Sequence, residues 1–470
     1  MKVQNKNFIF NVGYQLIMYL FPLITAAYIS RVLGAEKLGT YSYVSSIVTI
    51  CGMFCLLGIS NYGNREIAKI RDDYEIRCNT FSEIFSLQLI LSGIVIFFYC
   101  LAIYIYNTEY KTLFIIEILN LFAIGLDVSW LFFGMERFKI TLTRNFFVKC
   151  ISMLLIVVFV RSSNDLTIYT IIMCLSSLLS QVFLLIVSKQ LVSFKFIIGK
   201  SLIKHLKPCL VLFVPVIAFS IYRVMDKTMI GLFSTKTELG YYENAERIIN
   251  IPIMVISALG TVMLPYMAHS IHNNNETEYK KTIKESMHLA TIIATFSTIG
   301  LMILGNDIAI LLYGYTFLKS GLLISILSVT IIASGWANVL RTQYLIPKSM
   351  DKVYVVSTIV GAVVNFLCNI IFINLYGAVG ACIGTILAEF AIAIFQTIPV
   401  WNDLDITIYI RDLLLNIIKA ILMGIIIVCI AHFIKPIIVR IILDIFVAII
   451  LFVVMDREYI FNIFLCKRHI

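Results

Sequence analysis

The sequence Arg223-Val224-Met225-Asp226-Lys227 places three ionisable residues inside a long apolar stretch. The run before it, 208–222, is too short to cross a bilayer alone, so the helix must continue through the charges to about Phe233. Arg223, Asp226 and Lys227 are three and four residues apart and therefore share one helix face. We predict a net positive patch facing a water-filled cavity, with Asp226 holding Arg223 in place. The alternative is a helix end whose basic side chains reach the interface.

Two further basic residues stand at the end of an apolar stretch or within one. Arg31 ends the first stretch, and Lys149 lies in the fifth, because the run after it is too short to span without the residues before it. Both are candidate substrate contacts. The alternative is an interface anchor for Arg31 and a side chain reaching the interface for Lys149.

Glu389 lies near the middle of the apolar stretch 377–400. A carboxylate at that depth is costly, and it is typical of a proton or cation site or of a partner for a buried base. Glu389 is therefore a candidate for coupling transport to an ion, H+ or Na+, with structural pairing as the alternative.

Two pairs of polar amide residues stand four residues apart on apolar stretches: Asn11 with Gln15, and Asn365 with Asn369. This spacing places each pair on one helix face. We expect Asn11 and Asn365 to support the site, and the alternative is hydrogen bonding between helices.

Enzyme-like patterns are weak. Asp403-Leu404-Asp405 resembles the metal-binding motif of sugar-nucleotide transferases but occurs alone in a short loop, and His269 with His272 has no nearby thiol or carboxylate cluster. No phosphate-binding glycine loop is present, so no cofactor, metal or catalytic residue is expected.

The elements that carry these residues are membrane-spanning helices. The chain has 470 residues, of which 60% are hydrophobic and only 14% charged, which exceeds the apolar share of soluble proteins. The net charge of +10 is therefore attributed to cytoplasmic loops, which attract Lys and Arg, rather than to nucleic-acid binding. About twenty apolar residues suffice for one crossing. Fourteen such stretches are predicted, at 8–30, 41–59, 81–105, 112–133, 141–160, 167–188, 207–233, 248–268, 288–312, 321–345, 353–374, 377–400, 413–433 and 437–455.

Two halves are indicated by charge and by an internal echo. Most Lys and Arg fall in loops on the side of the N-terminus, so both termini are expected in the cytoplasm. Leu38-Gly39-Thr40-Tyr41 after the first span is echoed by Leu239-Gly240-Tyr241-Tyr242 after the seventh. We predict a six-helix bundle at 1–190, a basic cytoplasmic linker at 191–206, a second six-helix bundle at 207–400, and two extra helices with a cytoplasmic tail at 401–470.

Several loose motifs in a specific order carry a family resemblance over essentially the whole chain. The chain resembles Wzx-type polysaccharide flippases, whose superfamily includes lipid II flippases and multidrug and toxin extruders. The residues that carry it are Ser30-Arg31-Val32-Leu33-Gly34 with Leu38-Gly39, Asn64-Arg65-Glu66-Ile67-Ala68, Asp127, Trp130, Gly134, Glu136, Phe138, Lys139, Met225-Asp226-Lys227 with Gly231, Gly240-Tyr241-Tyr242-Glu243, Gln343 with Leu345-Ile346-Pro347, and Tyr376-Gly377-Ala378-Val379-Gly380-Ala381 before Glu389.

The resemblance implies an all-α fold with two six-helix bundles in a V around a cavity that opens alternately to each side. It implies that an undecaprenyl-pyrophosphate-linked oligosaccharide is carried to the outer leaflet of a bacterial inner membrane for O-antigen, lipopolysaccharide or capsule synthesis, alongside a polymerase and glycosyltransferases. Arg31, Arg223, Lys227 and Lys149 would then offset the charge of the pyrophosphate or contact the glycan. The alternatives are a cation-coupled multidrug exporter, which would favour acidic cavity residues, and a membrane polymerase or ligase, which would need a large outer loop.

Overall fold

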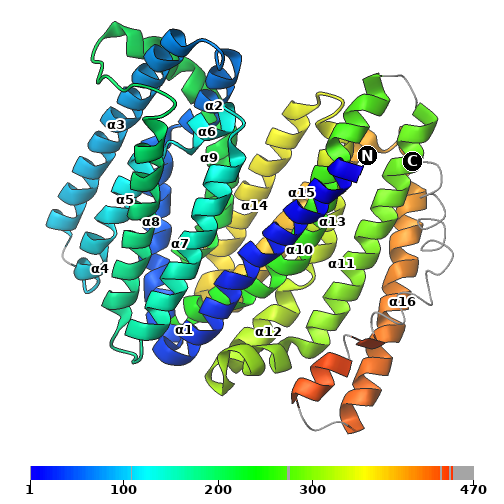
Figure 1. The fold of residues 1–470 in the computed structure, drawn as a ribbon. Helices are drawn as coiled ribbons and strands as arrows, with labels where there is room; N and C mark the ends of the chain where they lie inside the picture. The colour runs from blue at the N-terminus through cyan, green and yellow to red at the C-terminus, as the bar shows by residue number, and fades with distance from the viewer. Residues whose placement is uncertain (1, 107, 273–275, 434–436, 444–445, 448–470) are drawn as a thin grey trace. The chain divides into compact units, whose positions relative to one another are not determined.

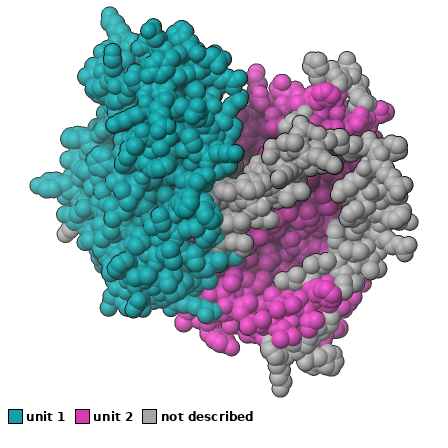
Figure 2. Space-filling model, in the orientation of Figure 1, with its two compact units in different colours: residues 1–240 teal, residues 241–470 magenta. Residues whose placement is uncertain are grey.

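The computed structural model describes residues 2–106, 108–272, 276–433, 437–443 and 446–447, with side chains described from Phe21 onward apart from a few helix positions. Every regular element in this part of the chain is helical, which confirms the all-α prediction (Figure 1). The chain forms two compact units, residues 1–240 and 241–470, coloured separately in Figure 2. The four-part division predicted from the sequence stays a prediction.

Unit 1 is built around the long helix α1, which packs against α3, α5 and α9. The start of α10 also belongs to this unit. Its helices are α1 (Lys2–Leu56), α2 (Ile59–Lys69), α3 (Tyr74–Ile105), α4 (Lys111–Ile116), α5 (Ile118–Gly125), α6 (Ser129–Gly134), α7 (Phe138–Phe159), α8 (Leu166–Ser188), the short η1 (Lys200–Leu202) and α9 (Ile203–Phe233).

Unit 2 is organised around α11, which packs against α12, α13 and α16, and around the closely packed pair α14 and α15. Its elements are α10 (Lys236–His272) from residue 241 on, α11 (Glu276–Tyr313), η2 (Tyr315–Phe317), α12 (Leu318–Leu327), α13 (Thr330–Leu340), the π-helix η3 (Arg341–Leu345), α14 (Asp351–Tyr376), α15 (Ala378–Thr397), η4 (Ile398–Val400) and α16 (Ile406–Phe433).

Ten described helices are long and apolar enough to cross a membrane, or eleven when the bent pair α12 and α13 counts as one crossing. The prediction of fourteen is compatible with this. The continuous stretch Phe21–Lys69 covers two predicted crossings, α9 covers another, and most of the predicted last span, 437–455, lies outside the described residues.

Two glycines from the family motifs end helices where a left-handed backbone is needed. Gly34, with φ 77°, interrupts α1 three residues after Arg31, so Arg31 does lie at the end of the first crossing. Gly377, with φ 60°, forms the turn between α14 and α15, and a Cβ on Gly380 would collide with the Phe372 carbonyl. Glycine alone tolerates both conditions without strain, which explains these motif positions.

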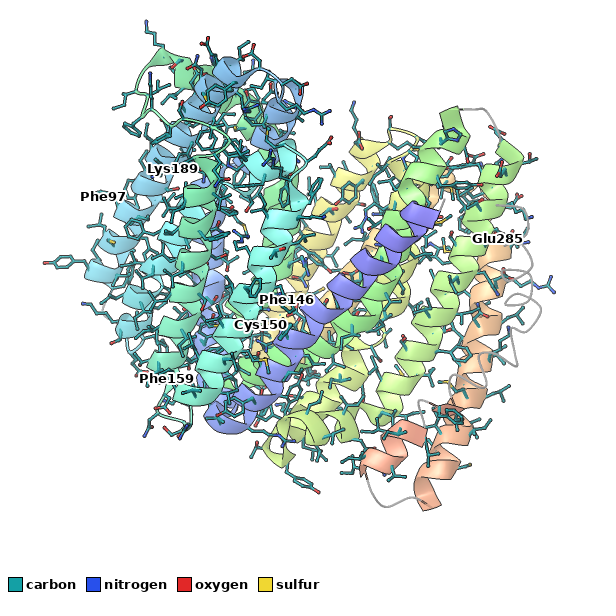
Figure 3. All side chains as sticks on the ribbon, in the orientation of Figure 1. Phe97, Phe146, Cys150, Phe159, Lys189 and Glu285 are labelled. Carbon is teal, nitrogen blue, oxygen red and sulfur yellow. The ribbon has the colours of Figure 1, made fainter. Side chains whose placement is uncertain are left out.

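The buried core of unit 1 is aromatic. Trp130 on α6 lies against Phe81 of α3, with ring centroids 5.4 Å apart, and its indole N–H donates to the Gln88 side-chain oxygen at 3.1 Å. By contrast, Phe97 and Phe159 point away from their helices into the surroundings and are 64% and 56% exposed (Figure 3). Large apolar side chains on the outside are expected where lipid is the solvent.

Candidate functional site

Helix α9 carries the charged patch without a break. It runs from Ile203 to Phe233, which confirms that the helix continues through the charges to Phe233. Arg223 is exposed, Lys227 is half-buried and Asp226 is only 5% exposed. One face of α9 thus combines two cations with a nearly buried carboxylate.

The packing of α9 on α1 positions this patch. The Thr228 hydroxyl donates to the Ser46 hydroxyl of α1 at 2.9 Å. Gly231 lies so close to the Tyr43 ring that a Cβ there would collide with it. The motif glycine at 231 therefore permits the close approach of the two helices, and the bond between Thr228 and Ser46 links them.

The other predicted basic contacts also lie in unit 1. Arg31 is exposed near the break in α1, and Lys149 is half-buried in α7. The side chain of Asn11 lies outside the described residues. A single site shared by Arg31, Lys149 and the α9 patch stays a prediction.

Glu389 and the asparagine pair lie in unit 2. The Ser334 hydroxyl of α13 donates to the Glu389 carboxylate at 2.7 Å, and Glu389 is half-buried. Asn365 and Asn369 are fully buried, and the Asn369 amide donates to Asn365 Oδ1 at 3.1 Å within α14. The hydroxyl bond stabilises an ionised or neutral carboxyl at this depth, and the coupling role stays a prediction.

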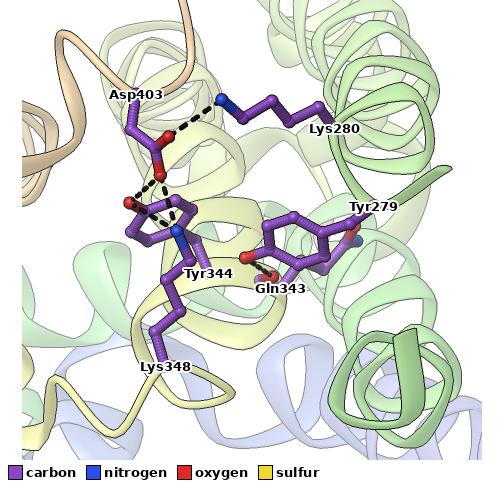
Figure 4. Close-up of polar contacts among 6 residues, drawn as sticks. All are labelled: Tyr279, Lys280, Gln343, Tyr344, Lys348 and Asp403. Atoms are coloured by element: carbon purple, nitrogen blue, oxygen red, sulfur yellow. Dashed lines mark hydrogen bonds and ion pairs between the residues drawn. The ribbon is translucent and has the colours of Figure 1, made fainter. Parts of the chain in front are cut away.

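Asp403 belongs to an ion cluster that sequence reasoning missed (Figure 4). Its carboxylate lies 2.9 Å from Lys280 Nζ and 2.6 Å from Lys348 Nζ, and it accepts a hydrogen bond from the Tyr344 hydroxyl. Bonds from Lys348, Tyr344 and Lys280 hold the pKa of Asp403 well below its usual range. Asp403 therefore ties the start of α11 and the end of η3 to the loop before α16.

This cluster explains the isolated acidic motif. Two lysines form ion pairs with the Asp403 carboxylate. Among the residues that the structure describes, no group of three or more metal-ligating side chains occurs. A cluster drawn from three distant segments leaves no local signal in the sequence, so only the tertiary structure reveals it.

A second, partly buried cluster joins α2, α3 and α9 in unit 1. His205 Nδ1 lies 2.7 Å from the Tyr62 hydroxyl, and His205 Nε2 lies 2.9 Å from Glu83 Oε2. Lys204 Nζ lies 2.7 Å from the same carboxylate oxygen. Because a carboxylate only accepts, Nε2 must carry a proton, and Nδ1 can accept from Tyr62 or donate to it. This cluster was also missed, since its members are far apart in sequence.

These features define a polytopic α-helical membrane protein, with ten or eleven described helices long and apolar enough to cross a bilayer. Residues 5–271 match the family described as "Polysaccharide biosynthesis protein". Because the match covers more than half of the chain, the chain belongs to this family and is a membrane protein of polysaccharide biosynthesis.

Known relatives agree with this assignment. The chain is 24% identical to a Shigella dysenteriae protein named "Putative O-antigen transporter" over 80% of this chain and 95% of that one. An Escherichia coli K12 protein of the same name is 21% identical over 82% of this chain and 94% of that one.

Solved structures show the same fold. A lipid II flippase, MurJ, in an inward closed conformation matches with a TM-score of 0.77 at 16% identity, covering 96% of this chain and all of that one. An inward-facing multidrug resistance transporter of the MATE family matches with a TM-score of 0.64 at 15% identity, covering 84% and 96%. The predicted fold class and family are confirmed.

Proposed function

We propose that this protein is a flippase that moves an undecaprenyl-pyrophosphate-linked oligosaccharide from the cytoplasmic to the outer leaflet by alternating access. The observation that carries the proposal is the face of α9, where exposed Arg223 and half-buried Lys227 flank nearly buried Asp226. A pyrophosphate loses its hydration inside a membrane protein, and Arg and Lys offset that loss through charge-assisted hydrogen bonds. The names of the Shigella and Escherichia coli relatives support a cargo destined for O-antigen.

The proposed function also implies a membrane location, an orientation and an energy source. The protein would lie in a bacterial cytoplasmic membrane with both termini in the cytoplasm, as the distribution of Lys and Arg favours. It would act between the glycosyltransferases that build the repeat unit and the polymerase that joins it. An H+ or Na+ gradient would drive export, with Glu389 as the ion site.

The test is to delete the gene in its host and locate the lipid-linked repeat unit. The proposal expects the unit to accumulate in the inner leaflet and surface polysaccharide to disappear, with both restored by the intact gene. Normal arrival of unpolymerised units at the outer leaflet would exclude it.

The second candidate is a cation-coupled multidrug exporter. The bond between Ser334 and Glu389 favours it, because an acidic group inside the membrane can exchange between a proton and a cationic drug. Drug sensitivity of the deletion strain, with intact surface polysaccharide, would select this candidate over the flippase.

A further inference from the structure

Unit 1 contains an apolar cavity of about 610 Å³ between α1, α3 and the segment that follows α3. It is lined by Tyr43, Ile47, Cys51 and Phe54 of α1, by Ile94, Val95, Phe98, Tyr99, Ala102 and Ile103 of α3, and by Tyr106, Thr108 and Phe114. The Tyr99 hydroxyl donates to the Phe114 carbonyl at 3.0 Å, so this polar tip is already satisfied. The cavity therefore suits an apolar occupant.

The length of this cavity matches one leaflet. At 1.5 Å per residue, the α1 positions from Tyr43 to Phe54 span about 16 Å, which is close to half of a hydrocarbon core of about 30 Å. Ile94 and Phe98, which line it, are 49% and 61% exposed, so the cavity is open along its side. A lipid chain could enter from the bilayer without passing through water.

A cation stands at the Tyr43 end. Lys236 Nζ lies 3.4 Å from the centre of the Tyr43 ring and 5.4 Å from that of Tyr110, and it donates to the Gly231 carbonyl. An ammonium group has three donors, so donors remain for an anion. Burial, Glu109 and Glu36 raise the pKa of Tyr110, which shows that two carboxylates also face this end. Their negative charge would oppose an anion at this end, so binding of a phosphate would depend on the positive charge of Lys236.

We propose that this cavity binds the isoprenoid chain of the lipid-linked cargo, with its first phosphate beside Lys236. The inference rests on the proposed function. The unsaturated, methyl-branched chain would pack against the rings of Phe54, Phe98 and Phe114, where aromatic faces add to the apolar contact. The predicted topology places 106–111 and 234–236 on the outer side, so this is a site for the cargo after it has been flipped.

The test uses the full-length protein in phosphatidylcholine nanodiscs and a polyprenyl monophosphate with a photoreactive group in its chain. Labelled positions are mapped by peptide mass spectrometry. Ala102→Trp fills the cavity, and Leu101→Trp is its matched control, since Leu101 is 42% exposed on the same helix and does not line the cavity. We expect labelling of α1 and α3 to fall by at least about tenfold in the first variant and to be unchanged in the second.

Two further arms identify the ligand. Lys236→Ala should weaken binding of the polyprenyl phosphate by about tenfold and leave the matching polyprenol unaffected. Competition by phosphatidylglycerol that lowers labelling as much as unlabelled polyprenyl phosphate does would overturn the inference. Full labelling of Ala102→Trp would also overturn it. If Ala102→Trp does not fold, Cys51→Phe fills the same cavity from α1. If the cavity binds no isoprenoid but cells still export the repeat unit normally, the binding site is refuted and the proposed function stands. If the cavity binds the polyprenyl phosphate but the protein exports no repeat unit, the proposed function is refuted and the binding site stands.

Discussion

Gly39 and Gly240 pack backbone against backbone. A Cβ on Gly39 would collide with the Lys236 carbonyl and the Gly240 amide, and a Cβ on Gly240 would collide with the Ala35 carbonyl. These are the two glycines of the Leu-Gly-x-Tyr echo, so equivalent positions of the two sequence segments meet in unit 1.

Gly39→Ala should therefore lower the free energy of unfolding by about 1–3 kcal/mol or more, because the backbone itself would have to move. Gly93→Ala is the control, since a Cβ there has nothing within 4 Å and the site is helical. That change should be neutral or add about 0.5–1 kcal/mol. Thermal unfolding in detergent measures both, and equal behaviour of the two variants would contradict the contact.

Arg223→Ala and Lys227→Ala should each lower export of the repeat unit by about tenfold or more, the loss expected for one charge-assisted bond. Both residues are at least partly exposed on α9, so the amount of protein in the membrane should not change. The readout is surface polysaccharide against protein level. Lys281→Ala, whose side chain is 71% exposed at the start of α11, controls for loss of one charge. Undiminished export in both α9 variants would refute the cationic site.

Asp403 should make stability depend on pH in a defined direction. Its pKa in the folded protein is depressed, so its stabilising contribution is present above the unfolded value of about 3.9 and is lost as pH falls below it. Asp403→Asn should cost about 1 kcal/mol at neutral pH, since a third of the side chain stays exposed to water, and the difference from the wild type should shrink in acid.

Asp405→Asn is the matched control for this cluster. Asp405 lies two residues away with φ 46°, a conformation that Asn also tolerates. Melting curves between neutral pH and about pH 3 compare the two variants. A gap between wild type and Asp403→Asn that widens in acid would contradict the assignment.

Tyr62 and His205 should be energetically coupled through their 2.7 Å contact. In a double-mutant cycle, Tyr62→Phe and His205→Gln should show an interaction energy of about 0.5–3 kcal/mol. Tyr28→Phe combined with His205→Gln is the control cycle. The Tyr28 hydroxyl donates to the Val160 carbonyl at 2.8 Å, so this change also removes a tyrosine hydrogen bond but one to a different partner, and the two effects should be additive. Additive effects of the Tyr62 and His205 changes would show that the contact carries no energy.

Glu389→Gln should abolish the dependence of export on the coupling ion, because the amide cannot bind and release a proton. Ser334→Ala removes one hydrogen bond and keeps the carboxylate, so it should reduce transport without abolishing its ion dependence. Transport assayed in vesicles under imposed H+ or Na+ gradients distinguishes them. If export by the Glu389→Gln variant still depends on the ion gradient, Glu389 is not the coupling site and its role is structural.

The sequence by itself determined the class of fold and the continuity of α9. Apolar runs of membrane length are local, so they can be read without knowing what each helix contacts. The run before Arg223 was too short to span, and the helix that ends at Phe233 followed from that length alone. Motif glycines such as Gly377 could likewise be noticed in the sequence, although the reason for them came with the turn they form.

Only the tertiary structure decided which polar groups meet. Lys280, Lys348 and Asp403 come from three separate segments, as do Tyr62 and His205, and no spacing rule links such residues. The contact between Gly39 and Gly240 shows the difference most directly. The repeated Leu-Gly-x-Tyr motif can be recognised in the sequence alone. Each glycine is necessary because the two backbones are in contact, and that contact depends on helices brought together across about two hundred residues of chain.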